Sequence, residues 1–116
     1  MAIRRVVPDI KSDEIEPSRK FYVDFLGFEL SMDLGWIVTF TSPENPAAQV
    51  SILHGSAPLP QPDMTIEVTD LDAVHAAAVA RGIEIVYPLT EEPWGVRRFF
   101  VLDPNGLVIN LMSHVP

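Results

Sequence analysis

The sequence predicts an α+β fold in which two tandem strand–helix–strand–strand–strand modules form a curved mixed sheet, shaped as a cup with the helices on its outer face. The same order of apolar, turn and helical segments occurs twice along the 116 residues, with a proline-rich connector at residues 57–62 between the copies. Each copy has one helix, which covers one face of its sheet and leaves the other for the shared cup. We therefore expect one domain over residues 1–116, with module 1 at 1–56 and module 2 at 63–116.

The first copy begins with an apolar strand at residues 2–10 and continues into a helix at residues 16–27. Pro17 suits the first turn of that helix, and Gly27 suits its left-handed end. Phe21 and Phe25 are four residues apart, so they share one helix face. Strands at 28–34, 36–42 and 48–55 follow, with turn residues between them.

The second copy repeats this order. A strand at residues 63–70 ends at Asp70, which can cap the alanine-rich helix at 71–82. Three more strands are predicted at 83–89, 96–102 and 107–112. The turn Asp103-Pro104-Asn105-Gly106 between the last two has proline second and glycine fourth, as a type I turn prefers.

Composition excludes several classes of protein. The net charge is −8 and the eight basic residues form no long stripe, so we expect no nucleic-acid partner. The absence of cysteine excludes disulfides, thiolate metal ligands and a thiol nucleophile. No apolar run reaches the roughly 18 residues of a membrane span, and the first residues lack the apolar region of a secretory signal. We therefore expect a cytoplasmic protein with no membrane partner.

Three segments carry a resemblance to a known family: SRKFYVDFLGFEL at 18–30, VTDLDAVHAAAVARGIEIV at 68–86 and PWGVRRFFVLDPNGLVINL at 93–111. They resemble the vicinal oxygen chelate superfamily, which includes glyoxalase I, extradiol dioxygenases, and the fosfomycin- and bleomycin-resistance proteins. The resemblance implies the two-module fold and a homodimer. In the enzymes it also implies a divalent metal in the cup, held by His, Gln or Glu from the first, fourth, fifth and eighth strands.

Carried over to this chain, the four ligand positions fall at Val7, Ile52, Asp63 and Asn110, and Asp9 is the oxygen donor nearest to the first of them. One carboxylate and one neutral amide make a weak site for a transition metal. We therefore expect no cofactor and no metal ligand, and a divalent metal is the disfavoured alternative. The Asn110 amide can instead donate and accept hydrogen bonds with an organic ligand.

Strand alternation gives the other candidates for the cup face. It places Met112 beside Asn110, and it places Asp63, Thr65 and Glu67 together. Glu67 is the candidate catalytic base or counter-charge, and the alternative is an ion pair with Arg5 or Arg98. One of Phe99 and Phe100, and one of Arg97 and Arg98, should face the cup, but the sequence does not say which.

Trp36 and Trp94 are expected at the rim of the cup, where an aromatic ring can stack on a planar or cationic ligand. Packing in the core or at a dimer interface is the alternative. His54 follows the fourth strand and can reach the mouth of the cup. The predicted ligand-binding residues are Val7, Trp36, Ile52, His54, Asp63, Thr65, Glu67, Trp94, Arg98, Phe100, Asn110 and Met112.

The leading prediction is a homodimeric, metal-independent protein that sequesters an aromatic or cationic small molecule, similar to the bleomycin-resistance branch and hence to antibiotic-resistance proteins. The first alternative is a lyase, isomerase or dioxygenase of the same superfamily, with a degenerate metal site or with Glu67 as a metal-free base. The second is an interaction module whose cup is filled. The sequence fixes neither the ligand nor the surface of the dimer.

Overall fold

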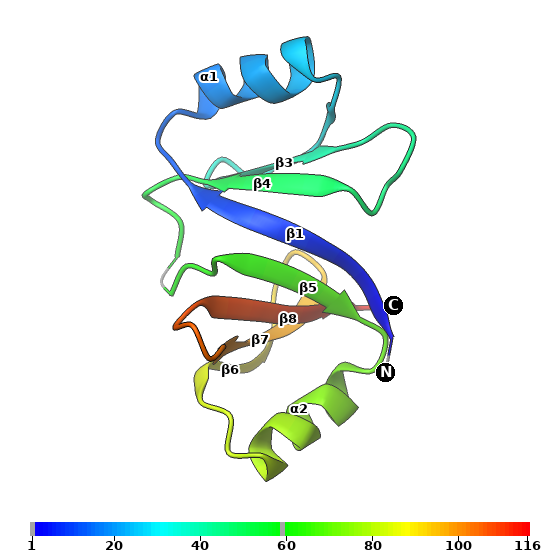
Figure 1. The fold of residues 1–116 in the computed structure, drawn as a ribbon, viewed down its shortest axis with the longest axis vertical. Coiled ribbons are helices and arrows are strands. Elements are labelled where there is room, and N and C mark those ends of the chain that lie inside the picture. Colours follow the sequence, from blue (N-terminus) through cyan, green and yellow to red (C-terminus); the bar gives the residue numbers. More distant parts are fainter. Residues whose placement is uncertain (1, 59) are drawn as a thin grey trace. The chain divides into compact units, whose positions relative to one another are not determined.

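The computed structural model describes residues 2–58 and 60–116, and its elements follow the predicted order (Figure 1). The α+β class is confirmed. No helix of the described residues is long and apolar enough to cross a membrane. The elements are β1 (Ile3–Lys11), α1 (Ile15–Arg19), the π-helix η1 (Lys20–Phe25), β2 (Glu29–Asp33), β3 (Ile37–Thr41), β4 (Gln49–Leu53), β5 (Met64–Val68), α2 (Leu71–Ala80), β6 (Ile85–Glu91), β7 (Val96–Leu102) and β8 (Val108–His114).

The chain forms two compact units. The N-terminal unit comprises Val7–Gln61, and the C-terminal unit comprises Pro62–Pro116 with the start of β1 up to Val6. The strand order is β2-β3-β4-β1 in the first and β5-β8-β7-β6 in the second. In both, the first strand of the copy pairs in parallel with the last, and the other pairs are antiparallel. The repeated order read from the sequence is therefore a repeated topology, while the cup and the module boundaries stay predictions.

In the C-terminal unit, α2 lies along one face of the sheet (Figure 1). The helix begins where predicted, because the Asp70 carboxylate accepts a hydrogen bond from the Ala73 N–H at 3.2 Å. It is followed by Gly82 at φ 68°, in the left-handed region that glycine adopts without strain. The buried cluster beneath the helix contains Val68, Leu71, Ala78, Phe99, Val101 and Ile109.

In the N-terminal unit, the predicted helix at 16–27 is not one regular α-helix, because its second half is the π-helix η1. The Leu26 N–H reaches the Phe21 carbonyl at 3.1 Å, one residue further back than in an α-helix. The wider turn lets both Tyr22 and Val23 pack against the sheet cluster. The ring of Tyr22 stacks on Phe40 at 5.5 Å. Phe25 contacts the ring of Phe21 as predicted, but both rings are exposed.

The register of β4 differs from the expected one. Ile52 lies opposite Val38 and is fully buried in the cluster that packs against residues of α1 and η1. Ser51 lies opposite Thr39 and beside Asp9 of β1, so Ser51, not Ile52, occupies the other face. Side chains alternate along a strand, so an offset of one residue moves the whole set to the opposite face. Ile52 is therefore a core residue, and its assignment to the ligand face is corrected.

This register predicts different costs for two neighbouring substitutions. Ile52→Ala should lower the free energy of unfolding by about 2–4 kcal/mol, because it leaves a cavity in the core. Ser51→Ala should cost about 1 kcal/mol, since it removes only the hydrogen bond between the Ser51 and Thr39 hydroxyls at 2.7 Å. Urea unfolding measures both values. A smaller cost for Ile52→Ala than for Ser51→Ala would contradict the register.

Candidate functional site

The sheet of the C-terminal unit has a second face, opposite α2, which carries most of the predicted site residues. Met64 and Ile66 of β5 pack in the cluster beneath α2, so Thr65 and Glu67 lie on the opposite face, as alternation predicted. The register then gives two rows across this face. One row consists of Thr65, Asn110, Phe100 and Tyr87, and the other consists of Glu67, Met112, Arg98 and Thr90.

The structure also shows which residue of each adjacent pair, Phe99/Phe100 and Arg97/Arg98, lies on this face. Phe99 is buried beneath α2, where the edge of His75 meets its ring at 4.9 Å. Phe100 therefore lies on the opposite face. Arg97 forms an ion pair with Asp72 of α2 at 2.9 Å, so Arg98 is the arginine that shares the face of Phe100.

Asn110 stands at the centre of this face. The residue is 7% exposed, and its Nδ2 donates a hydrogen bond to the Thr65 hydroxyl at 3.1 Å. Its Oδ1 is buried and has no hydrogen-bond partner. A buried carbonyl oxygen without a partner costs about 1–3 kcal/mol, so native proteins contain few of them. The amide therefore leaves one hydrogen-bonding position on this face unsatisfied.

Glu67 lies on the same face and is held by two basic side chains. Its Oε1 accepts from Arg5 Nε at 2.6 Å, and its Oε2 lies 3.0 Å from His114 Nδ1. Burial alone would raise the pKa of the Glu67 carboxyl, but the hydrogen bonds and charges of Arg5 and His114 outweigh it and hold the pKa below its ordinary value. The alternative pairing with Arg5 is thus the one present. A carboxylate with a lowered pKa is a weak general base.

Arg98 forms a second paired group. Its guanidinium contacts the Glu92 carboxylate at 2.8 Å, with both side chains mostly buried. It also lies 4.8 Å from the ring centroid of Phe100, 5.0 Å from that of Trp94 and 5.3 Å from that of Tyr87. The Tyr87 hydroxyl donates to the second oxygen of Glu92 at 3.0 Å.

Sequence reasoning missed two members of this group, Glu92 and Tyr87. Irregular pairing between β6 and β7 shifts the register around Tyr87, and strict alternation cannot follow such a shift. The acidic pair before the Pro93-Trp94-Gly95 turn was the available signal for Glu92, because a hairpin turn places residues on either side of it close together.

The N-terminal unit contains the remaining predicted residues. Val7 is buried on the face of β1 that also carries Asp9. Asp9 is 7% exposed and lies beside Ser51. Trp36 is half-buried, and its carbonyl accepts from the His54 N–H at 2.9 Å.

His54 lies in the loop after β4. Its Nδ1 is 2.8 Å from the Ser56 hydroxyl, and its Nε2 is 3.5 Å from Asp13 Oδ1. These contacts hold the ring against its own loop and against the segment before α1.

The donor set does not fit a resident metal ion. Of the four positions implied by the resemblance, Val7 carries an aliphatic side chain, and on β4 neither Ile52 nor Ser51, which lies on the opposite face, is a strong metal ligand. Asp63 accepts the Val108 N–H through Oδ2 at 2.8 Å, and Asn110 is a neutral amide. In the described part of the chain, no group of three or more His, Cys, Asp or Glu side chains could hold a metal ion. We therefore assign no chemistry to a metal here.

The lowered pKa of Glu67 predicts a pH dependence of stability. A carboxyl whose pKa is lower in the folded state stabilises the fold above its unfolded pKa, and this contribution is lost as the pH falls through the folded value. Glu67→Gln should lower the free energy of unfolding by about 1–3 kcal/mol at pH 7. The difference from the parent should shrink as the pH falls below about 4.5.

Urea unfolding between pH 3 and pH 7 measures this difference, with the exposed loop variant Glu44→Gln as the matched control. A Glu67→Gln deficit that stays constant across this range would contradict the ion-pair assignment.

Solved structures share this fold. A glyoxalase/bleomycin resistance protein/dioxygenase superfamily member from Vibrio splendidus is 22% identical, with a TM-score of 0.71 over 97% of this chain and 99% of that one. Methylmalonyl-CoA epimerase from Streptomyces coelicolor is 15% identical, with a TM-score of 0.72 over 99% and 100%. An extradiol ring-cleaving dioxygenase from B. fuscum is 20% identical, with a TM-score of 0.73 over 98% of this chain and 33% of that one.

Structural similarity at these low sequence identities shows a common fold and does not show a common activity. Comparison with curated protein sequences finds no match. The family model described as Glyoxalase/Bleomycin resistance protein/Dioxygenase superfamily matches residues 6–111. That match covers both copies of the repeated unit, and the chain therefore belongs to the glyoxalase/bleomycin resistance protein/dioxygenase superfamily.

Proposed function

We propose that this chain binds and sequesters an uncharged organic molecule on the face of the C-terminal sheet opposite α2, with Asn110 as the recognition group and without a metal ion. The observation that carries this proposal is the buried Asn110 Oδ1 without a partner. Because this oxygen is buried, a ligand N–H or O–H would reach it only after a neighbouring side chain moved aside, and the new hydrogen bond would then remove the cost of leaving the oxygen unsatisfied.

The proposal depends on which atom of the amide is left without a partner. If the amide were rotated by 180°, its oxygen would face Thr65 and its NH2 group would be the unsatisfied one. In the orientation that the structure gives the amide, the atom without a partner is the oxygen. Phe100 and Met112, which are almost fully buried, flank the amide and keep its surroundings apolar, where a hydrogen bond is strong.

The charges on this face favour an uncharged ligand. Arg5 is paired with Glu67, and Arg98 is paired with Glu92. A charged ligand buried here would need a counter-charge that these pairs already use. Of the two tryptophans expected to attract a cation, Trp94 lies against Arg98 instead, so this contact supports an uncharged guest over the cationic one that the overall charge favoured.

An enzyme of the same superfamily is the competing function. The epimerase from Streptomyces coelicolor was solved with 2-nitronate-propionyl-CoA, so this fold can hold an organic ligand. In this chain, Glu67 as a metal-free base would first have to leave Arg5 and His114, and its lowered pKa disfavours proton abstraction. Binding without conversion is the simpler use of this set of residues.

A thermal-shift screen tests the proposal. The full chain would be mixed with uncharged aromatic amides and phenols, with cationic glycopeptides, and with Zn²⁺, Mn²⁺ or Ni²⁺ alone. Stabilisation by an uncharged donor-bearing compound, with none from the metals, is expected. Stoichiometric metal in the purified protein, or turnover of a ligand that stops with Glu67→Ala, would favour the enzyme instead.

Asn110→Leu should separate recognition from stability. Leucine has a similar size and removes the unsatisfied oxygen, so the free energy of unfolding should stay within about 1 kcal/mol of the parent or rise. Binding of the compound selected by the screen should fall at least about tenfold, as calorimetry would measure, because one hydrogen bond in apolar surroundings is lost.

Ser113→Ala on the same strand is the matched control, because Ser113 faces the side opposite to Asn110. Unchanged affinity in Asn110→Leu, or an equal loss in Ser113→Ala, would refute the assignment.

A further inference from the structure

We propose that a groove between α2 and the sheet of the C-terminal unit is a second binding site, which takes an aliphatic carboxylate of about eight carbons. Its aliphatic chain lies in the groove, and its carboxylate binds the Arg81 guanidinium. This site lies on the face of the sheet that α2 covers, so it is independent of the Asn110 site and of the function proposed for that site.

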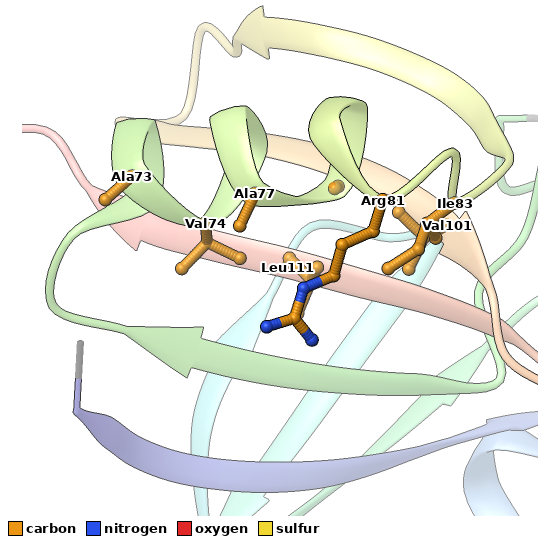
Figure 2. Close-up of a pocket in the computed structure, with 8 residues that line it drawn as sticks. Ala73, Val74, Ala77, Arg81, Ile83, Val101 and Leu111 are labelled. Atoms are coloured by element: carbon orange, nitrogen blue, oxygen red, sulfur yellow. The ribbon is translucent and has the colours of Figure 1, made fainter.

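Figure 2 shows the groove, a cavity of about 240 Å³ between the helix and the strands. All lining side chains except that of Arg81 are apolar. The lining residues are Ala73, Val74, Ala77, Ala78, Arg81, Ile83, Val101 and Leu111. Val101 and Leu111 come from β7 and β8 and form the floor, while Ile83 closes the end beyond the helix.

Small residues keep the groove open. Ala73, Ala77 and Arg81 recur every four residues, so they follow one edge of α2. The two alanines end at Cβ and fill little of the space beside the sheet. A longer apolar side chain at either position would occupy the groove itself.

Arg81 provides the charge. Figure 2 shows the Arg81 side chain extending from the end of α2 in front of the strand that carries Leu111. Within the described part of the chain, the backbone N–H of Arg81 donates a hydrogen bond to the Ala77 carbonyl, and no ion pair involves its side chain. Arg97 and Arg98, in contrast, are both paired with acids.

Charge complementarity selects the class of ligand. A cation beside an apolar groove matches a molecule with one anionic end and an otherwise aliphatic body, and the planar guanidinium can bind a carboxylate through two parallel hydrogen bonds. A volume near 240 Å³ holds roughly eight groups of about 30 Å³, the share of one water molecule in the liquid. Octanoate meets both requirements.

Titration of sodium octanoate into the full chain tests the site. Saturable binding is expected, with amide shifts in a ¹H–¹⁵N spectrum concentrated at Ala73, Ala77, Ile83 and Leu111. Arg81→Gln should weaken binding about tenfold or more, because the carboxylate loses its charged partner. Octanol, which is uncharged, should bind the parent more weakly than octanoate does. The two compounds should bind Arg81→Gln with equal affinity.

Two further variants sharpen the test. Ala77→Leu should also abolish binding by filling the groove, while its thermal midpoint stays close to the parent because leucine is a good helix former at an exposed position. Arg19→Gln on α1 is the matched loss of one positive charge and should bind octanoate as the parent does.

The proposal would be overturned by an absence of saturable octanoate binding, or by equal affinity in Arg81→Gln and Arg19→Gln. It would also be overturned if light scattering showed that Ala77→Leu dissociates a dimer, since a second copy of the chain would then cover the groove.

Discussion

The parallel pairing of β5 with β8 is the constraint on which the rest of the C-terminal unit depends. It sets Thr65 opposite Asn110 and Glu67 opposite Met112, while the intervening residues of both strands turn toward α2. The apolar set makes the helix-covered core, so the opposite face is free to carry polar groups. An amide there with one unsatisfied atom costs stability, and this cost is the ground for the recognition role that we propose for it.

The charged side chains on this face form ion pairs with one another. The carboxylates of Glu67 and Glu92 each have a basic partner, and the rings around Arg98 already solvate a cation. The net charge of −8 consequently says little about the ligand, because the acids that would attract a cation are elsewhere or neutralised. The resemblance implies a glutamate at this position in the family's enzymes, whereas this chain has a neutral amide, which can form hydrogen bonds but supplies no charge.

The sequence was sufficient to predict the element order, the Asp70 cap and the two different faces of β5 and β8, because these features follow from local periodicity and turn chemistry. It failed for Ile52, since the loop from Pro43 to Ala48 gives no marker of how many residues precede β4. It also missed the π-helix, which arises from packing of Tyr22 and Val23 against the sheet and not from helix propensity.

The partners of Arg98 could not be predicted from the sequence, because the register between β6 and β7 is shifted and strict alternation does not account for such a shift. The unsatisfied oxygen of Asn110 was equally beyond the sequence. Satisfaction of a buried amide depends on every neighbour that surrounds it, and here only Thr65 reaches it.

The stacking of Trp94 over Arg98 has an optical consequence. An indole beside a guanidinium emits according to that charge and its surroundings, and Arg98 shares a strand with Phe100, which lies opposite Asn110. The chain contains one other tryptophan, Trp36 in the N-terminal unit. With Trp36 changed to phenylalanine, the molecule would carry a single tryptophan, stacked on an arginine of the sheet that also carries the amide, and selective excitation of that indole could follow occupancy without any attached label.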